Sequence, residues 1–139
     1  GGDVICLEGP LGSGKTSLTQ GIGRGWGARR ELVSPSFVLV RQYERPEDHQ
    51  TLYHVDLYRI SGPGEAWALG IEEFMGSEEA VTVIEWPGRA DSLIPPDHLW
   101  IKLDFIERAD VTRRHLWFSA HGERHQALLR EFRHLAFGA

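Results

Sequence analysis

Short apolar runs, separated by polar or glycine- and proline-rich stretches, recur along the chain at the length of β-strands. They are rich in β-branched and aromatic residues, which favour strands. The run 80–84 is apolar apart from one threonine, as expected of a strand buried on both faces of a sheet. The segments predicted to be strands are residues 4–7, 37–40, 52–55, 80–84, 99–106 and 111–120.

Apolar residues at helical spacing follow several of these runs. The predicted helices are one that begins at Thr16, residues 65–75 with an interruption at Gly70, and residues 122–132. Gly21, Gly23 and Gly25 each cost the first helix about 1 kcal/mol relative to alanine, so we interpret them as packing positions. Hairpin connections are predicted at residues 44–50 and 108–110. No repeat or linker divides the chain, which indicates one α/β domain with a mixed sheet flanked by helices.

The loop between the first strand and the first helix has the sequence GPLGSGKT, residues 9–16, which fits the phosphate-binding (P-loop) pattern in its expected strand–loop–helix context. Glycines let successive backbone N–H groups surround an anion, and the helix N-terminus adds its positive dipole end. Lys15 is predicted to reach the β- and γ-phosphates of ATP, and the Thr16 hydroxyl to bind Mg²⁺. The residues predicted to contact the nucleotide phosphates are Gly12, Ser13, Gly14, Lys15, Thr16 and Ser17.

A Mg²⁺–triphosphate site also needs a carboxylate near the loop. Glu85 follows the strand 80–84 directly, and Asp56 follows the strand 52–55. His54 shares a strand face with Asp56, and both a structural and a functional role remain open for it. Ser34 and Ser36 flank a proline between the first helix and the next strand. They are either a switch that senses the γ-phosphate or an ordinary turn.

The chain has 139 residues and a net charge of −5, which disfavours strong unaided binding to nucleic acid. It contains no apolar run near the ~20 residues that a membrane span needs and no signal-peptide pattern, so we expect a cytoplasmic protein without membrane contact. The single cysteine, Cys6, lies in an apolar run and is predicted to be a buried thiol.

Several segments together resemble the TsaE (YjeE) family, the ATPases of bacterial tRNA threonylcarbamoyladenosine synthesis. The resemblance extends from Gly2 to about Leu129. The segments that carry it are LGSGKT (11–16), the glycines of the following helix, SPSF (34–37), HVDLYR (54–59), LGIEE (69–73) and IEWP (84–87). The family's usual N-terminal segment, which helps to cover the nucleotide base, is expected to be missing from residues 1–139.

The resemblance implies that Thr16 and Glu85 are the protein ligands of Mg²⁺. It places Asp56 and Glu85 around Mg²⁺ and the γ-phosphate, with Asp56 binding the nucleotide and both acids acting in catalysis. It also implies that Arg114 approaches the nucleotide, that Ser34 and Ser36 form the switch, and that Trp86 lies next to the site. The family binds the TsaB–TsaD pair and supports its turnover by ATP hydrolysis, so contact with tRNA is expected only through these partners.

Two other functions fit a single P-loop domain. A small-molecule kinase would need an arginine-rich lid, for which Arg108, Arg113 and Arg114 are the candidates, although they lie on a predicted hairpin. A regulatory module that binds nucleotide without turnover would be favoured if Asp56 or Glu85 pointed away from the loop.

Overall fold

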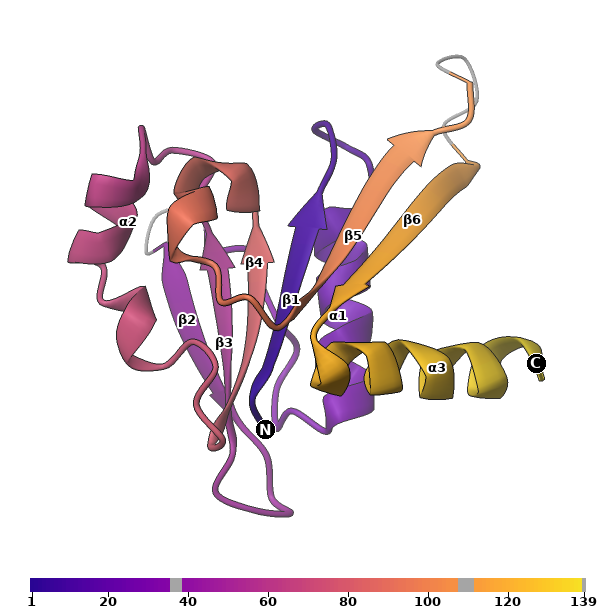
Figure 1. Cartoon of the computed structure of the whole chain (residues 1–139), viewed down its shortest axis with the longest axis horizontal. Helices are drawn as coiled ribbons and strands as arrows, with labels where there is room; N and C mark the ends of the chain where they lie inside the picture. Colours follow the sequence, from indigo (N-terminus) through magenta and orange to yellow (C-terminus); the bar gives the residue numbers. More distant parts are fainter. Residues whose placement is uncertain (36–38, 108–111, 139) are drawn as a thin grey trace.

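A computed structural model describes residues 1–35, 39–107 and 112–138 (Figure 1). Its strands form one mixed six-stranded sheet in the order β2-β3-β4-β1-β5-β6, with the edge pairs β2–β3 and β5–β6 antiparallel and the inner pairs parallel. The elements are β1 (Asp3–Glu8), α1 (Lys15–Trp26), β2 (Val40–Glu44), β3 (Thr51–Asp56), α2 (Pro63–Ala68), η1 (Ile71–Glu73), β4 (Ala80–Glu85), η2 (Pro87–Leu93), β5 (His98–Phe105), β6 (Arg114–His121) and α3 (Glu123–Phe137). The predicted single α/β domain with a mixed sheet is confirmed.

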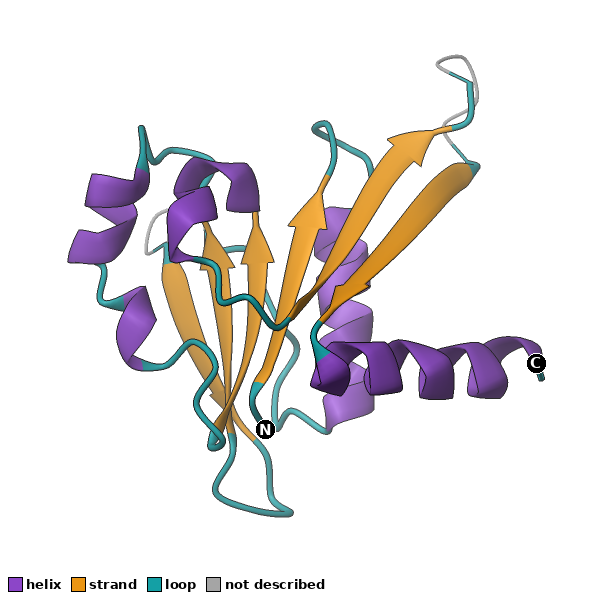
Figure 2. Ribbon diagram, in the orientation of Figure 1, coloured by secondary structure: helices purple, strands orange, loops and turns teal. Residues whose placement is uncertain are grey.

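Helices lie on both faces of the sheet (Figure 2). On one face, α1 packs its Leu18 and Ile22 against apolar residues of β1, β4 and β5, such as Leu7. On the other face, α2 and the short 3₁₀ segments cover residues of β1, β3 and β4, among them Cys6. Cys6 is fully buried as predicted, and this burial raises the pKa of its thiol to about 12. Among the described residues, no helix is long and apolar enough to span a membrane.

The second strand differs from the sequence prediction. It was predicted over residues 37–40, but β2 spans Val40–Glu44, and residues 36–38 lie outside the described part of the chain. Leu39, directly before β2, has a φ of +68°, so the extended backbone of the strand begins only at Val40. Buried and exposed side chains alternate at the end of the edge strand β2, where Tyr43 is buried and its polar neighbours Gln42 and Glu44 are exposed. In the described part of the predicted segment only Val40 belongs to β2, and the strand continues four residues beyond it.

The glycines of α1 differ in how much space a side chain would have at each position. A Cβ atom at Gly23 would lie 2.4 Å from Leu32, so this position needs glycine for close packing. At Gly25 no atom lies within 4 Å of the corresponding point, and at Gly21 only the Arg24 side chain does, at 4.0 Å. The interpretation as packing positions is thus right for Gly23 and wrong for Gly25, where alanine would meet open space.

Most of the remaining boundaries agree with the sequence pattern to within three residues. Gly70, with a φ of +73°, separates α2 from η1, as its position in the predicted helix suggested. The sixth strand begins at Arg114, three residues later than predicted, and the predicted turn 108–110 lies outside the described residues. The sequence pattern missed η2 and ended α3 at residue 132 instead of Phe137.

His125 attaches α3 to the sheet, a contact that the sequence pattern did not predict. Its ring is fully buried, and its Nε2 accepts a hydrogen bond of 2.9 Å from the backbone N–H of Val4. The opposite ring nitrogen, Nδ1, bonds to the carboxylate of Asp97. This pairing holds the first turn of α3 against the start of β1, the strand that leads into the glycine-rich loop.

Candidate nucleotide-binding site

The glycine-rich loop connects β1 to α1 at the carboxyl end of the parallel strands, where ligands bind in open α/β sheets. Gly12 and Gly14 have φ values of +77° and +103°, in the left-handed region that favours glycine. At Gly9, a Cβ atom would lie 2.5 Å from the carbonyl oxygen of Leu103 and 2.6 Å from Ser13 Oγ. The tight curvature of this loop therefore depends on glycines at three positions.

Lys15 begins α1 and lies under the loop with only 6% of its surface exposed. Its ammonium donates hydrogen bonds to the carbonyls of Gly9 and Pro10 and lies 4.5 Å from the centre of the Trp86 ring. Burial lowers the pKa of Lys15, and the nearby carboxylates of Glu85 and Asp56 partly oppose that shift. A partly desolvated cation beside a glycine-rich loop at a helix N-terminus is suited to binding phosphate.

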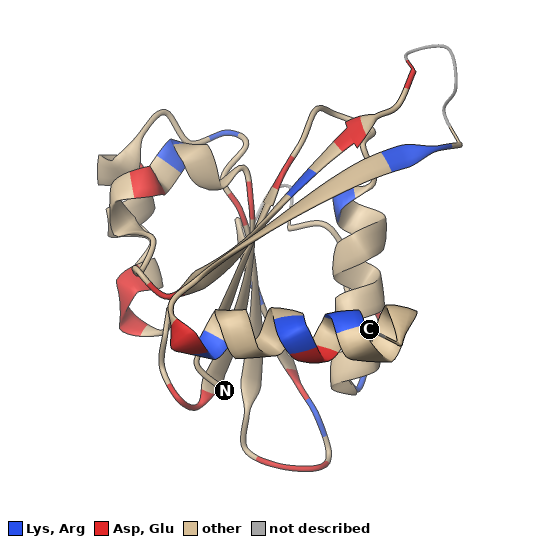
Figure 3. Ribbon diagram, turned by 45° about the vertical axis from the view of Figure 1, so that its right-hand side comes forward, with Lys and Arg blue, Asp and Glu red and all other residues tan. Residues whose placement is uncertain are grey.

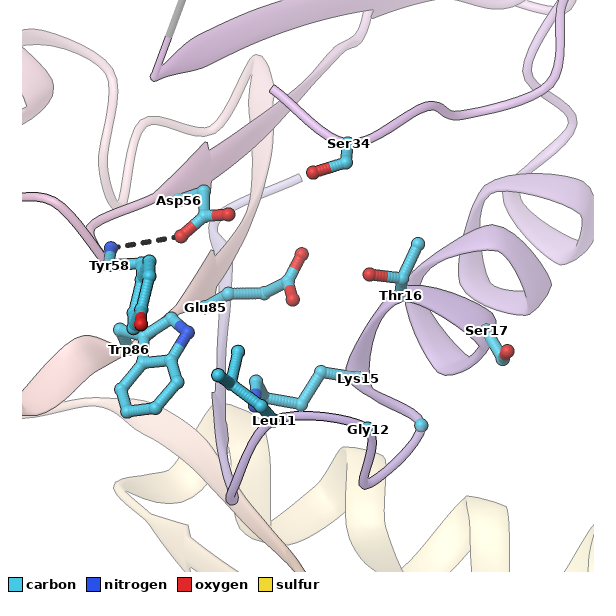
Figure 4. A pocket seen from close by; sticks show the side chains of 11 residues that line it. Leu11, Gly12, Lys15, Thr16, Ser17, Ser34, Asp56, Tyr58, Glu85 and Trp86 are labelled. Atoms are coloured by element: carbon cyan, nitrogen blue, oxygen red, sulfur yellow. Dashed lines mark hydrogen bonds between the residues drawn. The ribbon is translucent and has the colours of Figure 1, made fainter. Parts of the chain in front are cut away.

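Parallel pairing of β3 with β4 brings the two predicted acids together. In this register Asp56 lies opposite Glu85, at the carboxyl end of both strands. The Glu85 carboxylate points toward the Thr16 hydroxyl in the first turn of α1 (Figure 4). These groups line a cavity of about 340 Å³. Its lining residues are Leu11, Gly12, Gly14, Lys15, Thr16, Ser17, Ser34, Asp56, Tyr58, Glu85 and Trp86.

The other predicted site residues occupy different positions around this cavity. The Ser34 hydroxyl is directed toward it (Figure 4), whereas Ser36 lies outside the described residues. Ser13 is fully buried, and its hydroxyl has no hydrogen-bond partner among the described residues. Trp86 has a φ of +59°, an unfavourable conformation for a bulky residue, and this conformation accompanies its contact with Lys15.

Arg114 lies at the start of β6 and contacts the glycine-rich loop. Its guanidinium donates to the carbonyl oxygens of Ser13, at 3.0 Å, and Gly12, at 3.2 Å. It also lies 4.2 Å from the centre of the Phe105 ring. Arg114 is therefore placed to hold the loop backbone in shape, and its direct approach to a nucleotide stays a prediction.

Three residues that contribute to this region were not among the predicted site residues: Tyr58, Leu11 and Phe105. Tyr58 lines the cavity and packs against Trp86 with 4.9 Å between ring centroids. Its backbone N–H donates to Asp56 Oδ1 at 2.9 Å. Tyr58 belongs to the HVDLYR segment, so the signal was present. Nothing in the local pattern pointed to Phe105, because its role depends on the distant Arg114.

The donors present fit a magnesium ion. The Thr16 hydroxyl and the Glu85 carboxylate supply oxygen ligands on opposite sides of the cavity, and Asp56 is adjacent (Figure 4). Mg²⁺ retains several waters and takes one or two carboxylates together with phosphate oxygens, so it needs no larger protein cage. Within residues 1–35, 39–107 and 112–138, no group of three or more His, Cys, Asp or Glu is arranged to hold a metal by itself.

The environment of Asp56 leads to a stability prediction. Burial, reinforced by the charge of Glu85, raises the pKa of Asp56, although the Tyr58 N–H opposes this. A raised pKa in the folded state means that ionised Asp56 destabilises the fold, increasingly as pH rises above its ordinary value. We expect Asp56→Asn to raise the melting temperature of the ligand-free protein by a few degrees at pH 7.5, measured by thermal unfolding. The difference should vanish below about pH 3.9.

Asp48 offers a matched control of opposite sign. Its carboxylate accepts hydrogen bonds from Arg45, which lower its pKa to about 2. Asp48→Asn should therefore lower the melting temperature at pH 7.5, and this stabilising contribution should disappear as pH falls from about 3.9 toward 2. If Asp56→Asn also lowered the melting temperature at neutral pH, ionised Asp56 would not be a strained group of the site.

The loop, the strand order and the paired acids define the chain as a P-loop α/β protein. The family model described as threonylcarbamoyl adenosine biosynthesis protein TsaE matches residues 1–115. The chain therefore belongs to the TsaE family.

Individual relatives agree with this assignment. The chain is 36% identical over 130 residues to the tRNA threonylcarbamoyladenosine biosynthesis protein TsaE of Bacillus subtilis, covering 94% of this chain and 77% of the relative. It is also 36% identical over 132 residues to the protein of the same name from Streptomyces coelicolor, covering 88% and 83%. A crystal structure of B. subtilis YdiB superposes with a TM-score of 0.71 at 29% identity, covering 93% of this chain and 75% of that one.

Proposed function

We propose that this protein is a Mg²⁺-dependent ATPase that acts in tRNA threonylcarbamoyladenosine biosynthesis as a helper of the TsaB–TsaD complex. The observation that carries the proposal is the convergence of Lys15, Thr16, Asp56 and Glu85 on one cavity at the carboxyl ends of the strands. Family membership supplies the pathway, because the matching relatives are named for it.

In this proposal each group has a separate task. The N–H groups of the loop and Lys15 bind the phosphates, and Thr16 and Glu85 hold the metal. Bound Mg²⁺ would offset the negative charge that develops on the transferred phosphoryl group. Asp56 lies on the neighbouring strand, where its carboxylate can order a water for attack. Ser34, at the rim of the cavity, is suited to sensing the γ-phosphate.

The proposal also includes dependence on partners. The cavity is open to solvent on the side of Leu11, a lining residue that is 66% exposed. A site that does not exclude water by itself orients the attacking nucleophile poorly. Docking of the TsaB–TsaD pair would order the region around Ser34 and Trp86 and shift the population toward an active arrangement. Basic and acidic residues are interspersed along α3 (Figure 3), and the net charge of −5 disfavours strong binding of the chain alone to tRNA phosphates.

An ATPase assay with and without TsaB–TsaD, each in Mg²⁺ and in EDTA, tests the proposal. We expect slow hydrolysis by the isolated chain, well below the roughly 1–10³ s⁻¹ of typical enzymes, and a clear increase with the partners. A parallel anisotropy titration with tRNA should give weak, salt-sensitive binding by the chain alone. Full activity without partners, or tight tRNA binding by the isolated chain, would contradict the helper role. Transfer of phosphate to an added acceptor would identify a kinase instead.

A further inference from the structure

His54 is a buried polar residue directly beneath the paired acids. Only 1% of its side chain is exposed, and 5% of the Glu85 side chain. A hydrogen bond of 2.6 Å joins His54 Nε2 to Glu85 Oε2. A charged or polar group that is buried this deeply needs a partner, and here each group supplies one to the other.

The strand register explains why His54 meets Glu85 and not Asp56. His54 lies opposite Val83 in the parallel pair β3–β4, two residues before the Asp56–Glu85 position. Side chains two residues apart on a strand share a face, so His54, Asp56 and Glu85 all project toward α1. The Asp56 carboxylate is held elsewhere, by the backbone N–H of Tyr58. The two acids are thus oriented by different donors.

The bond to Glu85 also assigns a proton on the His54 ring. A carboxylate that binds Mg²⁺ is ionised and only accepts hydrogen bonds, so in the proposed metal site Nε2 carries the hydrogen that Glu85 Oε2 accepts. The opposite nitrogen, Nδ1, has no hydrogen-bond partner among the described residues. The tautomer protonated at Nε2 donates a hydrogen bond to the Glu85 carboxylate. It leaves Nδ1 as a buried acceptor without a partner, which destabilises the fold less than a buried N–H without a partner would.

We propose that His54 is a positioning residue that fixes the Glu85 carboxylate for metal binding. One oxygen of Glu85 is hydrogen-bonded to His54, so the carboxylate cannot rotate freely and stays directed toward the Thr16 side of the cavity (Figure 4). Donors in the outer shell of a metal site orient its ligands in this way, and their loss typically reduces metal affinity about 10–100-fold. The inference rests on the proposed Mg²⁺–nucleotide site. It adds a residue that acts through Glu85 and contacts neither the metal nor the nucleotide.

Two substitutions at His54 separate positioning from general packing. The amide nitrogen of glutamine can reach the place of Nε2, whereas that of asparagine reaches only the place of Nδ1. His54→Gln should therefore keep the bond to Glu85, and His54→Asn should lose it. The exposed strand residue His121 provides a control for the same change far from the cavity, as His121→Asn.

The measurement is Mn²⁺ affinity in the presence of saturating ADP, followed by the EPR signal of free Mn²⁺. We expect His54→Asn to weaken Mn²⁺ binding about 10–100-fold, while His54→Gln and His121→Asn stay within threefold of wild type (roughly 0.6 kcal/mol). ADP affinity in EDTA should be unchanged in every variant, because no metal is then involved. In a Glu85→Gln background, His54→Asn should cause no further loss, since the carboxylate on which it acts is gone.

Wild-type protein supplies a second readout in case His54→Asn fails to fold. Two-dimensional ¹H–¹⁵N spectra of histidine-labelled protein should show His54 protonated at Nε2, with a shift when Mg²⁺ is added to the ADP complex. A ring protonated at Nδ1 alone, or equal Mn²⁺ affinity in wild type and both His54 variants, would overturn the inference and leave the ATPase proposal intact. Absence of Mn²⁺–ADP binding by wild type would overturn both.

Discussion

Replacing Lys15 by alanine is expected to weaken Mg-ATP binding by about 10–100-fold while the protein stays folded. Charge-assisted hydrogen bonds from a partly desolvated ammonium to phosphate contribute roughly 1.5–3 kcal/mol, and about 1.4 kcal/mol corresponds to a factor of ten in affinity. The ligand-free fold should not suffer, because burial already lowers the pKa of Lys15 and so opposes its charged form. Alanine at this position also removes the free-energy cost of burying the Lys15 ammonium in the folded state.

Thermal unfolding with and without Mg-ATP measures this effect. A ligand at a hundredfold excess over its dissociation constant stabilises the native state by about 2.7 kcal/mol. Wild type should therefore melt at a clearly higher temperature with Mg-ATP, and Lys15→Ala should show little shift at the same concentration. Lys102 is the chain's other lysine and lies exposed on β5, so Lys102→Ala is the matched control and should behave as wild type. An equal shift in Lys15→Ala would remove the glycine-rich loop from the proposed function.

Replacing Glu85 by glutamine is expected to reduce partner-stimulated ATP hydrolysis by at least about 10²-fold. Glutamine keeps the size and one acceptor oxygen but lacks the negative charge that holds the metal. It also changes the partner of His54, which then faces a neutral amide. Nucleotide binding should persist, because the loop N–H groups and Lys15 are untouched.

The rate and the affinity are to be measured on the same preparations, with TsaB–TsaD present in the hydrolysis assay. Glu79→Gln makes the same chemical change at an exposed residue before β4 and should leave both quantities unaltered. Asp56→Asn should also reduce hydrolysis, although it is expected to stabilise the ligand-free fold. A Glu85→Gln variant that hydrolyses ATP at the wild-type rate would show that this acid is a structural partner of His54 and nothing more.

The sequence by itself determined the parts of this protein that depend on neighbours along the chain. The loop 9–14, Lys15 and Thr16 form a contiguous motif whose conformation follows from glycine freedom and helix-terminal donors, so its strand–loop–helix context was predictable. The buried strand β4 was equally clear, because a continuous apolar run needs no partner to be recognised. An acid at the end of such a strand was therefore a sound candidate for the site.

Only the tertiary structure decided which distant groups meet. The extent of β2 depends on the backbone at Leu39 and on pairing with β3, and the apolar pattern alone ended this strand four residues too early. Likewise, the bonds from His54 to Glu85 and from Arg114 to Ser13 join residues far apart in the sequence. Hydrogen bonds of this kind are set by strand order and register, which result from burial across the whole sheet, and no local spacing encodes them.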